Sequence, residues 1–431
     1  MEETKNNFNF NTIKVIFKSN KFKMITIIVF IILVIVINSS FLFHQKFSSK
    51  SYFININDAD RLENGNTILQ ISELQTAIRA NQGKVEEWAS VSSLIEINSE
   101  GKIVWDFSPD GLLHHIDHEI VERDGGYFFC DSFKDAIKFV NKATKTVEWI
   151  FSLGDINWTE VNPEWGPNHL YNLPCNQWNL EQCIDWSHLN DIDFKDYGSW
   201  EAMLVSIRNF NLIIEVNYTQ ARTRETATAE DICWYYTGEF YHQHNPDYLP
   251  NGNLLVVDSD NQRFVELNMT TKEIVWQWTH PSISWPRDCD LIPNKRLLIT
   301  DVDKVLIINI TSGEILQIFT KIFGGYEADY IESSDTILVS CGSSGILLEY
   351  DCETGKIIWK WGTDVIKQIT YANCIIFIIY EFMWIVITFQ MKAKWRWFLI
   401  AILFLVIGFE IFLLVNYYPN MTYIFVHAIN G

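Results

Sequence analysis

Residues 241–263 read YHQHNPDYLPNGNLLVVDSDNQR, a polar entry followed by a turn and an apolar strand. Pro250 can preset the backbone of a turn, and Gly252 supplies the positive φ that tight turns need. The apolar run LLVVD at 254–258 prefers a packed, pleated surface. The stretch therefore predicts a loop that leads through a tight turn into a buried strand.

Weaker copies of this pattern occur elsewhere in the chain, at 58–69 (DADRLENGNTIL), 118–129 (HEIVERDGGYFF), 188–206 (HLNDID, an expanded turn, then AMLVS), 287–298 (RDCDLIPNKRLL) and 327–338 (EADYIESSDTIL). Several copies continue with a second strand, a turn and a strand that ends in tryptophan, as in 265–276 (VELNMTTKEIVW). One such sheet cannot bury both faces, whereas a closed ring of six can. The sequence therefore predicts an all-β fold, a six-bladed β-propeller within residues 44–367.

Three apolar runs flank the repeats. Residues 24–43 have the length of a transmembrane helix, and the lysines before them indicate a cytoplasmic N-terminus. A cleaved signal peptide is the alternative for this run. Basic residues between the two C-terminal runs indicate a cytoplasmic link. We expect a multi-pass cell-membrane protein with an extracytoplasmic propeller, in the order tail 1–23, helix 24–43, propeller 44–367, helix 368–391, link 392–396, helix 397–418 and outer tail 419–431.

Composition and isolated residues narrow the class of protein. The net charge of −20 argues against nucleic acid as a partner. Glu381 and Glu410 lie inside the predicted C-terminal spans, where they are either functional or bonded helix to helix. Cys175 and Cys183 lie eight residues apart, and an oxidising exterior would permit a disulfide between them.

Histidines occur where the innermost strands are expected to begin. Such a cluster suits metal binding, acid–base chemistry or nucleophilic catalysis. Arg208 and Arg287 lie near it in the sequence and disfavour a cation, because a guanidinium matches the oxygens of phosphate or sulfate. The residues thus predict an oxyanion pocket with no metal and no cofactor. Aligning the six copies places these residues at equivalent positions facing the channel: Asp58, His118, His188, His244 or Asn245, Asp288 and Glu327.

Four motifs resemble the arylsulfotransferase family, the phosphoadenosine-independent aryl-sulfate sulfotransferases, and most closely its membrane-anchored archaeal members. The motifs are 185–191 (DWSHLND), 205–209 (VSIRN), 243–253 (QHNPDYLPNGN) and 285–290 (WPRDCD). The resemblance covers residues 55–365 and implies a six-bladed propeller. It also implies that a sulfuryl group passes from an aryl sulfate ester to a phenolic acceptor through a sulfohistidine.

The resemblance assigns roles to individual residues. It implies that His244 is the nucleophile and that His188, Asn190 and Arg208 bind the sulfuryl oxygens. It places His118 at a further catalytic position, with His114 and His115 as rivals. Arg287 and Asn245 complete the predicted substrate-binding set. His242 and Arg263 are expected to be structural.

The chemistry of these residue types agrees with that assignment. Neutral imidazole is a good nucleophile near pH 7, since its ordinary pKa is about 6.5. Positioned cations and hydrogen-bond donors would stabilise the charge that spreads onto the sulfuryl oxygens. The alternative function is an extracellular propeller that binds an anionic or aromatic ligand without catalysis. The tryptophans of one long loop would either stack on phenolic rings or pack: Trp158, Trp165, Trp178 and Trp186.

Overall fold

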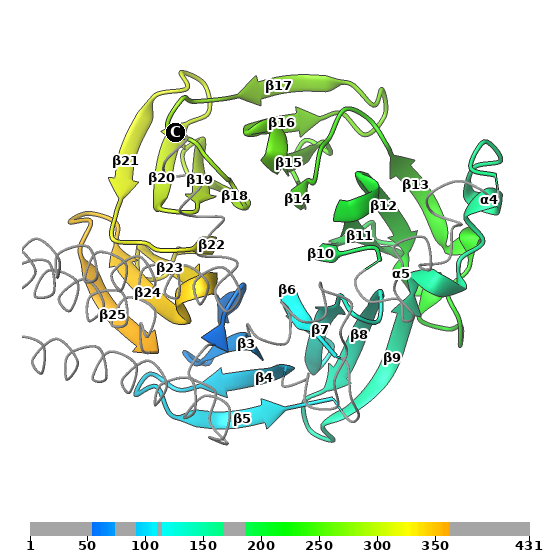
Figure 1. Cartoon of the computed structure of the whole chain (residues 1–431), viewed down its shortest axis with the longest axis horizontal. Helices are drawn as coiled ribbons and strands as arrows, with labels where there is room; N and C mark the ends of the chain where they lie inside the picture. Colours follow the sequence, from blue (N-terminus) through cyan, green and yellow to red (C-terminus); the bar gives the residue numbers. More distant parts are fainter. Residues whose placement is uncertain (1–53, 74–91, 110–113, 167–185, 363–431) are drawn as a thin grey trace, which may run out of the picture. The chain divides into compact units, whose positions relative to one another are not determined.

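Six antiparallel sheets surround a central axis in the computed structural model of the protein (Figure 1). The structure describes residues 54–73, 92–109, 114–166 and 186–362. Phe53–Asp364 forms one compact unit. Each sheet comes from one contiguous segment, and its first strand lies nearest the axis (Figure 1). The prediction of an all-β, six-bladed propeller is confirmed.

The strands of each blade follow one another outward from the axis. Blades 1 to 3 comprise β2 (Ala59–Arg61), β3 (Thr67–Glu73), β4 (Ser92–Ile97) and β5 (Ile103–Phe107), with β1 (Ile54–Asn55) also paired to β3; β6 (Ile116–Arg123), β7 (Gly126–Asp131), β8 (Ala136–Asn141) and β9 (Thr146–Ser152); and β10 (Leu189–Asp196), β11 (Glu201–Ile207), β12 (Leu212–Asn217) and β13 (Ile232–Tyr236). Blades 4 to 6 comprise β14 (His244–Tyr248), β15 (Leu254–Asp258), β16 (Arg263–Leu267) and β17 (Ile274–Trp278); β18 (Asp288–Ile292), β19 (Arg296–Asp301), β20 (Lys304–Asn309) and β21 (Ile315–Phe319); and β22 (Gly325–Ile331), β23 (Thr336–Cys341), β24 (Ile346–Asp351) and β25 (Ile357–Gly362).

The hydrophobic pattern of each strand matches its distance from the axis. The second strands β7, β15 and β23 are buried at every residue, because neighbouring blades cover both of their faces. The outermost strands bury alternate residues, as in β17, where Val275 is exposed and Trp278 is buried. Apolar surface buried between the blades is therefore the main source of stability.

The turn predicted at 249–253 is present between β14 and β15. Gly252 has a φ of 85°, and its N–H donates to the carbonyl of Leu249 at 2.9 Å. Asn251 Oδ1 accepts the N–H of Asn253 at 3.0 Å, an Asx turn that reinforces the reversal.

Side chains of the outermost strands fasten each blade to the next. In five of six blades the donor is a tryptophan indole, and in blades 4 and 6 it belongs to a second tryptophan, two residues after the one that ends the repeat. The hydrogen bonds run from Trp105 Nε1 to Lys142 O (2.8 Å), Trp149 Nε1 to Ala221 O (3.4 Å), Trp234 Nε1 to Met269 O (2.8 Å), Trp278 Nε1 to Gly313 O (3.0 Å), Gln317 Nε2 to Cys352 O (2.7 Å) and Trp361 Nε1 to Gly101 O (3.0 Å).

The ring closes between blades 6 and 1. Throughout the described residues no blade borrows a strand from the other end of the chain, so side-chain contacts join this seam. Ser340 Oγ donates to the carbonyl of Asn57 at 2.7 Å, and Arg61 pairs with Glu349 at 2.7 Å. The Trp361 bond described above belongs to the same seam.

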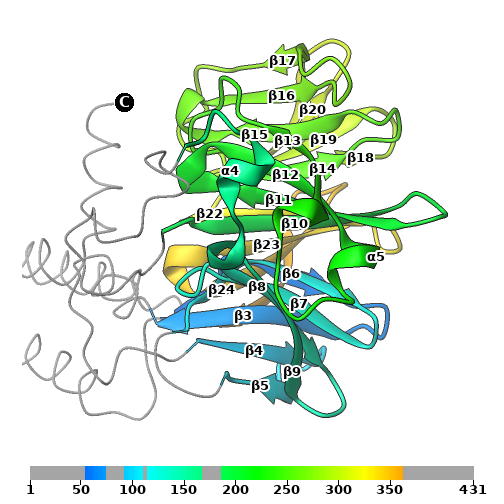
Figure 2. The ribbon, with the colours of Figure 1, turned by 90° about the vertical axis from the view of Figure 1, so that its right-hand side faces the viewer.

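Short helices complete the described part of the chain. In the side view α4 (Trp158–Val161) and α5 (Tyr218–Ala221) lie toward opposite rims of the ring (Figure 2). In these residues no helix is long and apolar enough to cross a bilayer. The predicted spans and their flanking segments lie outside the described residues, as do Cys175, Cys183, Glu381 and Glu410.

Candidate functional site

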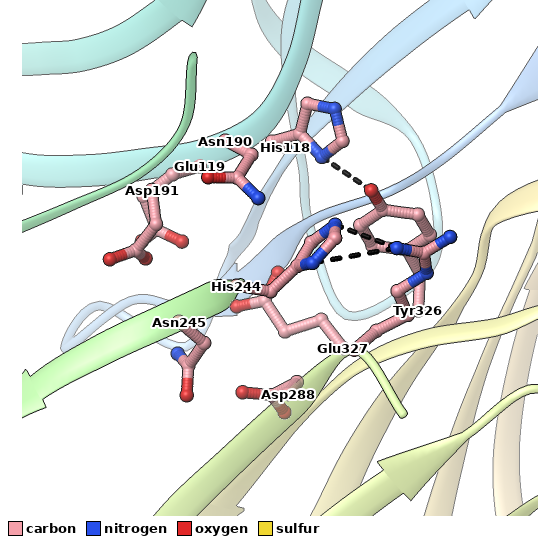
Figure 3. A pocket seen from close by; sticks show the side chains of 10 residues that line it. His118, Glu119, Asn190, Asp191, His244, Asn245, Asp288, Tyr326 and Glu327 are labelled. Carbon is pink, nitrogen blue, oxygen red and sulfur yellow. Dashed lines mark hydrogen bonds between the residues drawn. The ribbon is translucent and has the colours of Figure 1, made fainter. Parts of the chain in front are cut away.

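A cavity of about 250 Å³ lies at the heads of the innermost strands of blades 2 to 6. We call it the axial cavity. His118, His244 and Tyr326 point toward one another in it, and the carboxylates of Asp191 and Asp288 lie on its other side (Figure 3). It is lined by His118, Glu119, Asn190, Asp191, His244, Asn245, Arg287, Asp288, Tyr326 and Glu327.

Hydrogen bonds between blades show which residues are equivalent. Asp58 accepts the N–H of Ile120, Asn245 that of Cys289, and Asp288 that of Ala328. In each case the acceptor in one blade is equivalent to the residue just before the N–H donor in the neighbouring blade. Two columns of equivalent residues follow, one residue apart in the sequence. The acid column is Asp58, Glu119, Asp191, Asn245, Asp288 and Glu327; the base column is the residue before each of these, namely Asn57, His118, Asn190, His244, Arg287 and Tyr326.

These columns correct the alignment made from the sequence. In blade 2 the residue equivalent to Asp58 is Glu119, so the choice of His118 was wrong by one residue. In blade 3 it is Asp191, so the choice of His188 was wrong by three residues. Of the two choices offered in blade 4, Asn245 is the residue equivalent to Asp58.

Irregular pairing turns both columns toward the axis. In a regular strand His118 and Glu119 would face opposite sides. The ladder between β6 and β7 skips from Ile116 to Ile120, and His118 has a φ of 71°. A similar shift starts at His244 in β14, where Asn245 has a φ of 42°. Left-handed backbone costs a non-glycine residue roughly 1–2 kcal/mol, and such strain concentrates at functional sites.

The hydrogen bonds of His244 define which ring nitrogen carries the proton. Nδ1 lies 3.0 Å from the carbonyl of His242, which can only accept. Nη1 of Arg287 lies 2.8 Å from Nε2 and 3.4 Å from Nδ1, so the guanidinium lies over the imidazole face and the proton is assigned by the His242 carbonyl. Ser259 Oγ adds a contact of 2.8 Å to Nδ1. His244 is therefore protonated at Nδ1 and keeps a lone pair on Nε2.

Arg287 is itself held against an aromatic ring. Its guanidinium carbon lies 3.3 Å from the ring centroid of Trp285 and 5.6 Å from that of Tyr326. Stacking of this kind stabilises a guanidinium inside a protein. Arg287 thus brings a positive charge to the nucleophilic face of His244.

His118 connects Tyr326 with His188. The hydroxyl of Tyr326 lies 2.5 Å from His118 Nδ1, and His118 Nε2 lies 3.0 Å from His188 Nε2. Asp117 Oδ2 approaches His118 Nε2 at 3.2 Å and His115 Nδ1 at 3.0 Å. If Tyr326 donates to Nδ1, His118 carries its proton on Nε2, where the Asp117 carboxylate stabilises it.

Burial keeps the three central histidines neutral. It lowers the pKa of His118 to about 4, although Asp117 acts in the opposite sense. Burial and the nearby Arg208 hold the pKa of His188 well below its usual range. Burial, Arg287 and Arg208 do the same to the pKa of His244. Burial opposes ionisation of Asp117, but His115 and His118 hold its pKa well below normal, so this group is a carboxylate.

The structure brings five of the seven predicted site residues into the axial cavity: His118, Asn190, His244, Asn245 and Arg287. His188 lies behind His118 and contacts it. Arg208 does not line the axial cavity. It lies at the start of η4 (Arg208–Phe210), and its backbone N–H donates to the carbonyl of His188. Its guanidinium donates to Asn209 Oδ1 at 2.9 Å.

Asn190 also holds the backbone next to His244 in place. Its amide nitrogen donates to the carbonyl of Gln243 at 2.7 Å and so holds the backbone immediately before His244. Asn245 fastens blade 4 to blade 5 through the Cys289 N–H.

The remaining candidates have structural partners. His114 pairs with Asp131 at 2.5 Å and His115 stacks on Phe133, so of the histidines at 114–118 the one lining the axial cavity is His118. His242 pairs with Asp260 and Arg263 with Asp258, both at 2.6 Å. Trp158 and Trp165 are buried in the core, and Trp186 packs against the same cluster; Trp178 lies outside the described residues.

Sequence reasoning missed Tyr326, Asp117 and Ser259. Tyr326 could have been found, because it precedes Glu327 as Arg287 precedes Asp288 in the neighbouring copy. Asp117 and Ser259 carried no such signal, because their roles depend on how the loops meet.

No protein-family model matches the sequence, and no curated protein matches it. Solved structures resemble its fold at low identity. A protein of unknown function from Bacteroides caccae is 13% identical, with 63% of this chain and 90% of that chain covered and a TM-score of 0.42. Virginiamycin B lyase from Staphylococcus aureus is 12% identical, with 72% and 84% covered and a TM-score of 0.42. Resemblance at this level concerns the fold, and says nothing of the chemistry.

Proposed function

We propose that the protein is an aryl-sulfate sulfotransferase that moves a sulfuryl group from an aryl sulfate ester to a phenol. The observation that carries the proposal is the buried, neutral His244, whose Nε2 lies 2.8 Å from the guanidinium of Arg287. A nucleophile beside a fixed positive charge suits a substrate whose reacting atom is surrounded by anionic oxygens. The motif resemblance supports the same reaction.

The first half-reaction forms a bond between His244 Nε2 and sulfur. Arg287 exchanges its contact with Nε2 for the sulfuryl oxygens, which frees the lone pair to attack in line. The bond from sulfur to the aryl oxygen breaks, and its electron pair leaves on the phenolate. The imidazole, sulfated on Nε2, retains its Nδ1 proton against the His242 carbonyl.

The second half-reaction reverses these steps with a new phenol. Its oxygen attacks sulfur, the bond to His244 Nε2 breaks, and neutral imidazole is restored. His118, neutral in the free protein, is the proposed base that takes the proton from the acceptor phenol and later releases it to water. The Asp117 carboxylate stabilises the charge that His118 then carries.

The lining of the axial cavity suits the charged end of such a substrate. His118, His244 and Arg287 lie together on it, so a sulfuryl group there would meet a nucleophile, a base and a positive charge. We propose that the sulfuryl group enters the axial cavity while most of the aromatic ring remains outside it.

The test uses the full-length chain, purified in a mild detergent, with 4-nitrophenyl sulfate as donor and phenol as acceptor, without nucleotide. We expect release of 4-nitrophenol with ping-pong kinetics. His244→Ala should lose activity by roughly 10⁴-fold or more, the scale seen when a nucleophile is removed. Mass spectrometry should find an adduct of about 80 Da, one sulfuryl group, on His244 when the acceptor is omitted.

His280→Ala is the matched control. His280 is partly buried on the outer part of blade 4, where its ring bonds to Ser282 and stacks on Trp278, and it does not line the axial cavity. Full turnover by His244→Ala would contradict the nucleophile assignment. Binding of 4-nitrophenyl sulfate by the wild type without release of 4-nitrophenol would favour the alternative, a propeller that captures an anionic ligand without turnover.

We also propose that the protein is anchored in the cell membrane by the helices predicted at 24–43, 368–391 and 397–418, with the propeller outside the cytoplasm. The support is the length and charge pattern of these runs. Protease added to intact cells should digest the propeller. A propeller that is cleaved only after the cells are opened would contradict this orientation.

A further inference from the structure

Carboxylates accumulate on the axis beyond the base column. Five of the six acid-column positions are acidic, and a further aspartate follows two residues later in five blades: Asp60, Asp193, Asp247, Asp290 and Asp329. Like charges at such separations repel one another strongly when they are removed from water. The propeller therefore needs something on its axis that compensates these carboxylates.

Two groups of these residues are close enough to share one ion. Asp58, Glu119 and Glu327 each place a carboxylate oxygen within 4.8 Å of the others. Asp60, Glu327 and Asp329 form a second such group, so Glu327 belongs to both. Ca²⁺ binds oxygen at about 2.3–2.6 Å, which makes separations up to about 4.8 Å compatible with a common ion.

Buried oxygens without donors point to the same conclusion. Asp58 is fully buried; its Oδ2 accepts the N–H of Ile120, no N–H of the described residues reaches Oδ1, and its side chain meets the carboxyl group of Glu327. Asp191 is 2% exposed and lines the axial cavity; no N–H of the described residues reaches its Oδ2, and its side chain meets the carboxyl group of Glu119. Either a protonated carboxyl group or a cation can pair with such a buried carboxylate oxygen.

Burial and neighbouring acids disfavour the charged form of these carboxyls, and the pKa of Asp58, Glu119 and Glu327 is raised well above its usual range. Three carboxylates held this close repel one another unless a cation lies among them.

We infer that Asp58, Glu119 and Glu327 bind a divalent cation, and that calcium is the preferred ion. All the ligands are oxygens, which excludes the softer metals that favour histidine and cysteine. The charge of Arg287 keeps the ion away from the base column. Calcium accepts irregular arrangements of six to eight oxygens, whereas magnesium demands a near-ideal octahedron.

The site has a structural purpose that is independent of the proposed sulfuryl transfer. Asp58 belongs to blade 1, Glu119 to blade 2 and Glu327 to blade 6. The cation therefore joins the first and last blades at the seam of the ring, where no shared strand does so. Binding to the closed ring and not to the unfolded chain raises the stability of the fold.

The experiment measures calcium binding by the full-length chain after treatment with EDTA and dialysis. Calorimetry and thermal unfolding are followed at neutral pH with about 5 mM CaCl₂, above the roughly 1 mM dissociation constants of weak extracellular calcium modules. We expect measurable heat, a rise of several degrees in Tm and release of protons, because the ligands must ionise. MgCl₂ at the same concentration should give a smaller rise.

Glu327→Gln and Glu119→Gln should abolish the calcium response while circular dichroism remains that of the wild type. Glu327→Gln tests both groups of ligands at once. Asp106→Asn is the control for ions gathered by the net negative surface, because Asp106 is exposed, with a side chain 68% accessible, and should keep the full response.

The inference is overturned if the metal-free wild type shows no rise in Tm with calcium, or if the rise persists in both glutamine variants. The first result would mean that protons alone compensate the acid column. An equal response to magnesium would overturn the assignment to calcium. Should either variant fail to fold, the wild-type titration and its proton release still decide.

Discussion

His244 is defined by what its two ring nitrogens touch. A carbonyl fixes the proton on Nδ1, and a guanidinium lies 2.8 Å from Nε2. The carbonyl leaves the lone pair on Nε2, and the guanidinium brings a positive charge beside it. Together they prepare the same nitrogen for attack in every molecule, which reduces the cost of ordering the site during catalysis.

The pH dependence of kcat/KM tests the neutral state of these histidines. Their pKa values are lowered by burial, to about 4 for His118, so the imidazoles stay neutral as the pH falls past the ordinary value of about 6.5. We expect kcat/KM for the phenol acceptor to decline only as the pH approaches about 4, where His118 becomes protonated and can no longer act as the base. Circular dichroism at each pH checks that the protein remains folded. An acid limb centred near 6.5 would contradict burial as the cause.

Tyr326→Phe tests the chain from Tyr326 to His118. The change removes the hydroxyl 2.5 Å from His118 Nδ1 and leaves the ring. One hydrogen bond of about 1.4 kcal/mol corresponds to a roughly tenfold loss of kcat/KM. Without that donor the protonated form of His118 is less disfavoured, so its pKa should rise and the acid limb move to higher pH.

Tyr330→Phe is the matched control for this variant. Tyr330 lies in the same strand, β22, and bonds to Asp335 at 2.9 Å, away from the axial cavity. It should leave both kcat/KM and the acid limb unchanged. If Tyr326→Phe lowered kcat/KM at every pH without shifting the acid limb, the contribution of Tyr326 would be packing alone.

Two structural features recur from blade to blade, and one of them varies more than the other. The tryptophan bond to the next blade uses a side chain and a carbonyl, and Gln317 replaces tryptophan in blade 5 without losing it. The bulge at the head of the innermost strand is more variable. It is present in β6, β10, β14 and β22, whereas β18 pairs regularly from Asp288 onward.

Trp361→Phe tests the closure of the ring. The variant loses the indole bond to the Gly101 carbonyl at 3.0 Å and part of the ring's contact area. Trp276→Phe is the control, since Trp276 is also partly buried on an outermost strand but makes no such bond to the next blade among those described. We expect urea unfolding to show about 1 kcal/mol more destabilisation for Trp361→Phe, the contribution of one hydrogen bond. Equal losses would show that the seam does not depend on this bond.

The whole molecule has an axis divided by charge, with Arg287 and the histidines on one side and carboxylates on the other. Burial raises the pKa of Asp60 and of Asp288 to about 7, and burial or neighbouring acids also raise that of the other axial carboxyls, namely Asp58, Glu119, Asp191, Asp193, Asp247, Asp290, Glu327 and Asp329. An acid with a raised pKa stabilises the fold below its unfolded value of about 4 and loses that contribution as the pH rises through the folded value.

The stability of the metal-free protein should therefore depend on pH more strongly than that of the calcium-bound protein. The Tm of the metal-free protein should fall as the pH rises from about 5 through about 7, and calcium should remove most of that fall. The buried histidines oppose this trend between their lowered pKa in the fold, about 4 for His118, and the ordinary value of about 6.5 in the unfolded chain. A metal-free Tm that rises over the same interval would show that the axial acids are not the controlling groups.

From the amino-acid sequence alone, the number of blades and the neighbourhood of the site could be predicted. Each copy carries its own turn and strands, as at 249–253, and local propensity and apolar patterning act within a few residues. His118 and His244 were identified because histidines recur near the same place in several copies, Arg287 because it directly precedes Asp288, and Asn190 through the motif resemblance. Metal binding was considered for the histidines, and the acid column was not recognised as a candidate.

Tertiary structure decided which of these residues face one another. A one-residue bulge moves a side chain to the opposite face, and positive φ at His118 cannot be read from the sequence. The proton on His244, the contact of Tyr326 with His118 and the meeting of Asp58 with Glu327 join residues far apart in the chain. They exist only when the ring is closed, because closure brings the heads of separate strands to one axis.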